Sequence, residues 1–182
     1  MRRTSLIAGL ALVGAMASAA GAAPFRLSSS TIAEGVQMGR DQVFAGFGCS
    51  GGNLSPQLSW SDAPEGTKSF ALSAYDPDAP TGSGWWHWSV VNIPADVTAL
   101  EPGASGTAAM PAGAREIVND YGVSSFGGAC PPPGEVHRYV FTIHALPVET
   151  LELPETASPA LVGFMVNAAE LGRARITAVY TR

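Results

Sequence analysis

The sequence predicts an all-β fold with one helix near the C-terminus. Its 21 glycines and 14 prolines lie mostly between short apolar runs, which is typical of a chain with many turns and short strands. The clearest runs alternate apolar and polar residues, the period of a half-buried strand. Only one segment has the spacing of an amphipathic helix. A chain of 182 residues suggests one domain with a full core.

Residues 1–22 are predicted to be a secretory signal peptide. Arg2 and Arg3 precede an apolar run, and small residues follow, which is the order of regions in such peptides. The run is shorter than the roughly 20 residues that span a bilayer. Residues 20–22 read Ala-Gly-Ala, an A-x-A cleavage signal. We therefore expect residues 23–182 to form an exported domain, periplasmic or secreted; a buried N-terminal helix is the alternative.

The mature domain is acidic. Removing Arg2 and Arg3 leaves eight basic residues against fifteen acidic ones, a net charge of −7 with histidine neutral. This charge argues against nucleic acid as a partner and against general adhesion to anionic lipid, because both are polyanionic. No later apolar run is long enough to span a membrane. A local anion site remains compatible with the charge, since net charge says nothing about one pocket.

Cys49 and Cys130 are the only cysteines in the sequence. Export would take them into an oxidising compartment. There they can form one disulfide, which closes a loop of about 80 residues and contributes roughly 4 kcal/mol by restricting the unfolded chain. Two free thiols are the alternative. The pair has no histidines at matching spacing, so a structural zinc site is not expected. No other metal and no cofactor is expected either.

Five segments are expected to be strands because their apolar residues alternate or form short runs between turn residues. In chain order they are residues 58–60, 69–74, 87–92, 139–145 and 175–181. The segment 139–145 has the clearest period-2 pattern, and the segment 58–60 is the weakest candidate.

One helix is predicted before the last strand. Ser158 can cap its N-terminus, Pro159 suits its first turn and Gly172 can end it. One face of this helix is apolar and is expected to face the core. That face consists of Leu161, Phe164, Met165, Ala168 and Leu171.

The segment Asp76-Pro77-Asp78-Ala79-Pro80 follows the second predicted strand and holds two carboxylates. Its prolines fix their own φ angles and favour extended backbone in the residues before them, so the segment is stiff. Stiffness suits polar groups that must be held in place, but it also suits an ordinary turn. The segment alone leaves both interpretations open.

Three tryptophans and a histidine follow at residues 85–88. A histidine among apolar neighbours is more often a core residue than a ligand. The acids just before this one make a binding role as well supported as a core role. Strict alternation predicts two faces for the strand. Trp85, His87, Ser89 and Val91 would lie on one, and Trp86, Trp88 and Val90 on the other.

A second cluster, FGGACPPPGEVHRY at residues 126–139, leads into the clearest strand. Gly127 and Gly128 permit close approach of the backbone to a small ligand. A proline-rich loop that simply feeds a strand is the alternative explanation, and it suffices for the cluster alone.

The strand after this loop places His137 and Tyr139 on one face. Arg138 points the other way, and His144 lies on that other face, away from the site. Histidines, a tyrosine hydroxyl and backbone N–H groups can donate to a small anion such as phosphate. A carboxylate can orient the histidines or accept from an ammonium. The two clusters together therefore suit a small anion or a zwitterionic head group.

These motifs resemble those of the phosphatidylethanolamine-binding protein family, and more closely its bacterial branch, the Raf kinase inhibitor-like proteins. The resemblance covers about Phe25 to Tyr180 and implies a Greek-key sandwich of two antiparallel sheets with a C-terminal helix. It also implies a surface pocket for phosphate-like groups, including phospholipid head groups. The segments that carry it are GCSGGNLSPQLSW, DPDAP, WWHWSVVNIP and CPPPGEVHRYVFTIHAL.

The resemblance further implies which residues line that pocket. They are Asp76, Asp78, Pro80, Trp85, His87, Gly128, the backbone near Cys130, His137 and Tyr139. Two positions depart from the bacterial pattern: Phe126 stands where a tyrosine is common, and Ala129 where a proline is common. These departures remove one potential donor and loosen the loop.

The expected function is binding of a small anionic or phosphorylated ligand. The alternative is inhibition or regulation of a protease, kinase or other protein partner through a protein surface, because some members of the family act in that way. Enzymatic activity is not expected, since the chain contains no H-E-x-x-H helix and no nucleophile elbow is anticipated.

Overall fold

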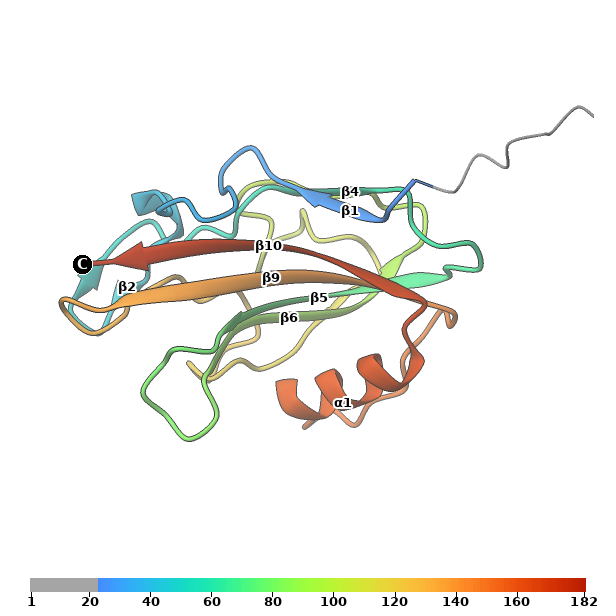
Figure 1. Cartoon of the computed structure of the whole chain (residues 1–182). Helices are drawn as coiled ribbons and strands as arrows, with labels where there is room; N and C mark the ends of the chain where they lie inside the picture. The colour runs from blue at the N-terminus through green and yellow to red at the C-terminus, as the bar shows by residue number, and fades with distance from the viewer. Residues whose placement is uncertain (1–22) are drawn as a thin grey trace, which may run out of the picture.

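The computed structural model describes residues 23–182 (Figure 1). The predicted signal peptide therefore lies outside the described residues. Within the described part, no helix has the length and apolar character needed to cross a membrane. A five-stranded antiparallel sheet dominates the fold, in the order β10-β9-β5-β6-β8. Its strands are β5 (Ser69–Asp76), β6 (Trp85–Pro94), β8 (Arg115–Glu116), β9 (Val136–Leu146) and β10 (Gly172–Thr181).

A second antiparallel sheet has the order β1-β4-β7 and packs on the inner face of the large one. It consists of β1 (Arg26–Ser28), β4 (Leu58–Ser61) and β7 (Ala99–Leu100). A two-stranded hairpin, β2 (Ala45–Gly46) with β3 (Cys49–Ser50), and a 3-10 turn, η1 (Arg40–Gln42), complete the elements before β4. The predicted all-β fold is confirmed, with this hairpin as a third small sheet.

The core between the two sheets follows from alternation along β5 and β9. Phe70 and Leu72 point inward from β5, and Phe141 and Ile143 point inward from β9. They meet Trp60 and its neighbours from the opposing sheet. Burying apolar side chains of this size stabilises the fold by about 1.5–3 kcal/mol each. All five predicted strands are present, each within a few residues of its predicted bounds.

A β-bulge in β6 interrupts the alternation at His87. Ala74 of β5 pairs with Trp88, but the next residue, Tyr75, pairs with Trp86. His87 is therefore the extra residue, and a bulge of this kind re-aims the side chains around it. His87 and Trp88 both point inward, while Trp86 points to the outer face of the sheet.

Two predictions about this strand were wrong for that reason. Trp86 and Trp88 do not share a face, because the bulge lies between them. His87 likewise does not share the face of Ser89 and Val91, which lie on the outer side with α1. A period-2 pattern cannot anticipate such an insertion, since it assumes one residue opposite one residue.

The helix α1 (Pro159–Ala169) lies on the outer face of the five-stranded sheet, away from β1 and β4 (Figure 1). Ser158 caps it as predicted, since its side chain accepts a hydrogen bond from the N–H of Leu161. Gly172 does not end it: the helix stops at Ala169, and Gly172 begins β10.

The predicted apolar face of this helix was also wrong. Val162 and Val166 are buried, with Met165 half-buried beside them. Phe164, placed on the inner face by the pattern, is 70% exposed, and Leu161 and Leu171 are exposed too, as is Ala168. Nearly every position of this helix is apolar or small, so the sequence contains two apolar stripes, and the smaller side chains fit against the sheet.

Candidate functional site

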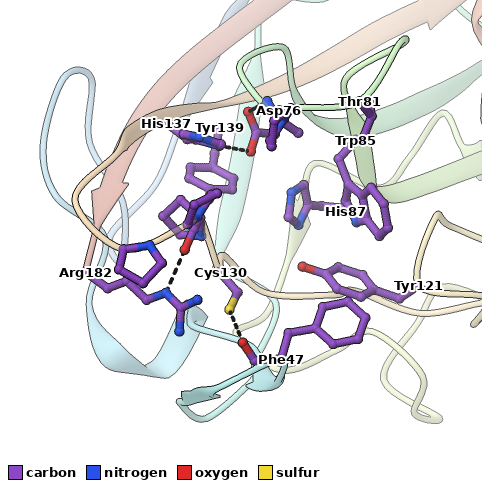
Figure 2. Close-up of a pocket in the computed structure, with 15 residues that line it drawn as sticks. Phe47, Asp76, Thr81, Trp85, His87, Tyr121, Cys130, His137, Tyr139 and Arg182 are labelled. Carbon is purple, nitrogen blue, oxygen red and sulfur yellow. Dashed lines mark hydrogen bonds and ion pairs between the residues drawn. The ribbon is translucent and has the colours of Figure 1, made fainter.

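A cavity of about 370 Å³ opens at one end of the inner face of the five-stranded sheet. Inner-facing positions that are apolar in the core become polar here, near the ends of β5, β6 and β9. Figure 2 shows the resulting ring of side chains around the opening. The strands contribute Asp76, Trp85, His87, His137 and Tyr139.

Asp76 is the buried carboxylate of the pocket, with only 3% of its surface exposed. Its Oδ2 accepts a hydrogen bond from His137 Nδ1 at 2.7 Å. Its Oδ1 accepts from the backbone N–H groups of Asp78 and Ala79, at 2.8 and 3.0 Å. A buried charge is stable only when it is paired and hydrogen-bonded. The tight turn after β5 supplies the two N–H groups, so the residues that follow Asp76 in the sequence help to hold its carboxylate in place.

His137 is held between two carboxylates. Besides the bond to Asp76, its Nε2 lies 3.0 Å from Glu135 Oε2. Burial opposes the charged ring, but the hydrogen bonds to Glu135 and Asp76 outweigh it and raise the pKa of His137. Carboxylate oxygens only accept, so the contacts at both ring nitrogens favour the protonated ring with both N–H groups engaged by the protein.

His87 is the opposite case. Its Nδ1 lies 2.7 Å from the carbonyl oxygen of Gly127. A carbonyl only accepts, so Nδ1 carries the proton. Burial lowers the pKa of His87, although nearby Gly127 and Asp76 oppose the shift. The ring is therefore neutral at neutral pH, and its Nε2 offers a lone pair. That Nε2 is buried and has no hydrogen-bond partner among the described residues.

Aromatic rings form the wall beside His87. Tyr139 and Tyr121 form T-shaped pairs with the imidazole, with ring centroids at 5.0 and 5.6 Å. Tyr121 stacks on Phe44 at 4.1 Å and donates its hydroxyl hydrogen to the carbonyl of Gly128. Phe47, at the tip of the β2–β3 hairpin, completes the rim and is 69% exposed. These rings fix the imidazole in a single orientation.

The opposite wall is the proline-rich loop at residues 130–133. The predicted disulfide between Cys49 and Cys130 is confirmed and ties this loop to the β2–β3 hairpin. Arg182 reaches the same wall, and its Nε donates to the carbonyl of Pro131 at 2.6 Å. The disulfide sulfur of Cys130 contacts the carbonyl of Phe47 in Figure 2 but carries no hydrogen to donate.

This fold has counterparts in known proteins. Residues 28–181 match the model of the family described as phosphatidylethanolamine-binding protein. The chain belongs to the phosphatidylethanolamine-binding protein family. The resemblance seen in the sequence motifs is therefore confirmed at the level of the family.

Relatives in the family include two Escherichia coli proteins. YbcL is 53% identical over 87% of this chain and 88% of its own, and YbhB is 50% identical over 86% and 99%. The crystal structure of YbcL has a TM-score of 0.85, at 52% identity over 88% of this chain and 99% of that one. LppC of Mycobacterium tuberculosis, named as a lipoprotein, is 34% identical over 92% of this chain and 78% of its own.

Seven of the nine residues predicted for the pocket line it in this family member. They are Asp76, Pro80, Trp85, His87, Cys130, His137 and Tyr139. Asp78 and Gly128 do not. Asp78 faces outward, where Arg138 donates to it from Nε, Nη2 and the backbone N–H. This arrangement lowers the pKa of Asp78 to about 2, chiefly through the hydrogen bonds from Arg138.

Gly127 and Gly128 admit neighbouring protein rather than ligand. A Cβ on Gly128 would lie 2.4 Å from the carbonyl oxygen of Gln42 and 2.6 Å from the nitrogen of Phe44. A Cβ on Gly127 would lie 2.3 Å from the ring of Tyr121. Both glycines thus let the loop pack closely against the segment before β2 and against the aromatic wall.

Eight lining residues were not predicted. Five of them adjoin predicted residues: Ala79, Thr81, Pro131, Pro132 and Pro133. The other three, Phe47, Tyr121 and Arg182, come from other parts of the chain. None belongs to the DPDAP, WHW or HRY segments. One signal was available for Phe47, because it lies two residues before Cys49, which was predicted to pair with Cys130. Tyr121 and Arg182 offered no comparable signal, since only the folded chain brings them to the other residues.

The described residues contain no cluster of three or more histidine, cysteine or acidic side chains that could hold a metal ion. Residues 48–52 do spell G-x-S-x-G, but they are not a nucleophile elbow. Ser50 ends the short strand β3, and no helix follows it. An elbow requires a sharp turn from a strand into a helix.

Proposed function

We propose that this protein binds a small anionic or phosphorylated ligand, such as a phospholipid head group, in the pocket around His87. One observation carries the proposal. Trp85 Nε1, His87 Nε2 and the hydroxyl of Tyr139 are buried without a hydrogen-bond partner among the described residues, and all three belong to the pocket. Buried polar atoms are nearly always paired, so three unpaired atoms at one place favour a ligand that pairs with them.

The three atoms favour a particular kind of ligand. Trp85 Nε1 only donates, and a tyrosine hydroxyl can donate, so both suit the oxygens of a phosphate. Neutral His87 accepts at Nε2, which suits either an ammonium or the hydroxyl of a monoprotonated phosphate. A zwitterionic phosphoethanolamine carries both kinds of group. The mixture therefore fits such a head group better than a fully deprotonated anion.

Arg182 supplies the positive charge. The charge on His137 is offset by Asp76 and Glu135, whereas Arg182 makes no ion pair among the described residues and bonds only a carbonyl. Its remaining N–H groups are free to meet a phosphate at the rim. This cation gives the pocket of an acidic protein its preference for anions.

We further propose that the site binds its ligand without catalysing a reaction. His137 uses both ring nitrogens on carboxylates, and Asp76 uses both oxygens on protein donors. Neither is left free to act as a general base. Cys130, in the pocket wall, is held in a disulfide and is no nucleophile. Turnover of a phosphoester panel by dialysed protein, lost in His87→Gln, would contradict this part.

Export to the periplasm or beyond the cell is also part of the proposal. The Cys49–Cys130 disulfide favours an oxidising compartment. The lipoprotein name of the relative LppC points in the same direction. Cell fractionation of a tagged full-length chain tests this part, and a product that stays cytoplasmic with its N-terminus intact would contradict it.

Sulfate titration tests the pocket, because sulfate stays divalent throughout the pH range of histidine. We expect chemical-shift changes at His87 and Tyr139, with loss of binding in Arg182→Gln. Because burial lowers the pKa of His87, its Nε2 becomes a donor only below the ordinary value of about 6.5. One new charge-assisted bond makes sulfate binding about tenfold tighter at acid pH.

His87→Gln is the matched control, since glutamine keeps a donor and an acceptor but does not titrate. We expect it to bind sulfate with an affinity that no longer rises on acidification. The absence of any shift at His87, or an unchanged pH dependence in His87→Gln, would contradict the proposal. Phosphoethanolamine compared with phosphate then asks whether the ammonium adds affinity at neutral pH.

A further inference from the structure

The outer face of the same sheet carries a polar row beneath α1. Register places Arg175 of β10 opposite Thr142 of β9, Thr142 opposite Ser73 of β5, and Ser73 opposite Ser89 of β6. One cation and three hydroxyls therefore lie side by side across four strands. A sheet face that packs against a helix is ordinarily apolar, because both surfaces leave water together.

The polar row forms the floor of a groove of about 280 Å³. Val162 and Val166 of α1 bound one side of this groove. Tyr75 and Trp86, whose ring centroids lie 4.5 Å apart, bound one end. The bulge at His87 turns Trp86 to this side. The groove therefore joins an apolar and aromatic wall to a polar floor, which is the usual composition of a small-molecule site.

The hydroxyls of the row are not used by the fold. Among the described residues, the side chains of Ser73, Ser89 and Thr142 make no hydrogen bond to protein. Ser89 is 1% exposed and Thr142 5% exposed, and both residues line the groove together with Ser73. Their hydroxyls are therefore polar groups at the groove floor that the fold leaves without a partner among the described residues.

Arg175 is the free cation of the row. Its neighbour Arg173 pairs with Glu170, whose other oxygen lies 2.5 Å from His144 Nδ1. No acidic side chain of the described residues lies within ion-pair distance of Arg175. Glu170 faces the same region and adds one negative charge. The surroundings therefore favour a ligand with a single negative charge over a dianion.

We propose that this groove is a second binding site, for a small organic carboxylate with an apolar or aromatic body. The carboxylate accepts hydrogen bonds from Arg175 and Thr142. The body lies against the valines of α1 and extends toward Ser73, two strands or about 10 Å from Arg175. This site is separate from the pocket around His87, which opens on the opposite face of the sheet.

The probe is 4-hydroxyphenylacetate, followed by NMR on the mature chain. We expect saturable shifts at Ser73, Ser89 and Thr142, and none at His87 or Tyr139. Arg175→Gln weakens binding at least tenfold, because it removes the only free cation of the floor. This side chain is exposed, so the variant keeps its fold. Lys68→Gln removes the same charge from an exposed position outside the groove and leaves binding unchanged.

The uncharged isostere 4-hydroxyphenylacetamide separates recognition of the carboxylate from simple apolar contact. Equal binding of the amide, full binding by Arg175→Gln, or shifts confined to the His87 pocket would each overturn the proposal. The variant His87→Gln is expected to bind the probe normally. Because that variant changes only the inner pocket, failure of the proposed sulfate site and failure of the groove give different results.

Discussion

The two acids of the DPDAP segment lie two residues apart, yet they bond to neighbouring residues on opposite faces of β9, Asp76 to His137 and Asp78 to Arg138. Asp76 is inner, buried, and bonded to His137. Asp78 is outer and bonded to the exposed guanidinium of Arg138. The same side chain therefore helps to build a pocket in one place and a surface ion pair in the other. Equal parity would place both acids on one face of a strand. But β5 ends at Asp76 and Asp78 lies in the turn that follows, so the turn decides which role each acid takes.

The histidines of the two faces differ in the direction of their pKa shifts. His137 on the inner face and His144 on the outer face each bond a carboxylate. A second carboxylate, Glu135, raises the pKa of His137. Burial lowers the pKa of His144, and although Glu170 opposes this, Arg173 and Arg175 reinforce it. One carboxylate partner does not suffice to keep a buried imidazole charged when cations stand nearby.

The variant Asp76→Asn should have the largest effect. It leaves a buried imidazolium with only the exposed Glu135 as its partner. Removing one member of a buried ion pair typically costs about 3–5 kcal/mol, and we expect a loss of that size in the free energy of unfolding. Denaturant unfolding at neutral pH measures it, and NMR titration should show that the pKa of His137 falls. A loss no greater than that of Asp78→Asn would contradict the claim that the buried pair of Asp76 stabilises the fold more than the exposed pair of Asp78.

The sequence predicted the five main strands, the helix and the disulfide, because alternation, capping residues and a single possible cysteine pair are local or counting signals. The motif resemblance located most of the pocket. What failed depended on packing. The bulge at His87 arises where β5 and β6 pair out of step, and the orientation of α1 depended on whether Val162 or Phe164 fits the sheet. Arg182 lies at the pocket because β10, which ends at Thr181, carries the end of the chain back to it.

Asp78→Asn should have a smaller effect that depends on pH. The native pKa of Asp78 is lowered from 3.8 to about 2, so its pair with Arg138 stabilises the fold above the unfolded value and loses that contribution as pH falls toward 2. Solvent screens this pair, because Arg138 is exposed. We expect the melting temperature at neutral pH to fall by about 2 °C. The melting temperatures of the parent protein and the variant are compared at neutral pH and near pH 2. A difference between them that persists near pH 2 would contradict the contribution of this ion pair.

The smallest effect is expected at a serine that the fold does not use. Ser69 and Ser89 are both fully buried on strands of the same sheet. Ser69 donates to the carbonyl of Val148 at 2.6 Å, whereas Ser89 faces the groove without a protein partner among the described residues. Ser69→Ala should cost about 1 kcal/mol, because it removes a part-buried hydrogen bond. Ser89→Ala should change the free energy of unfolding by less than about 0.5 kcal/mol. Equal losses in the two variants would mean that the Ser89 hydroxyl supports the fold, and the polar floor would lose one of the groups available to a ligand.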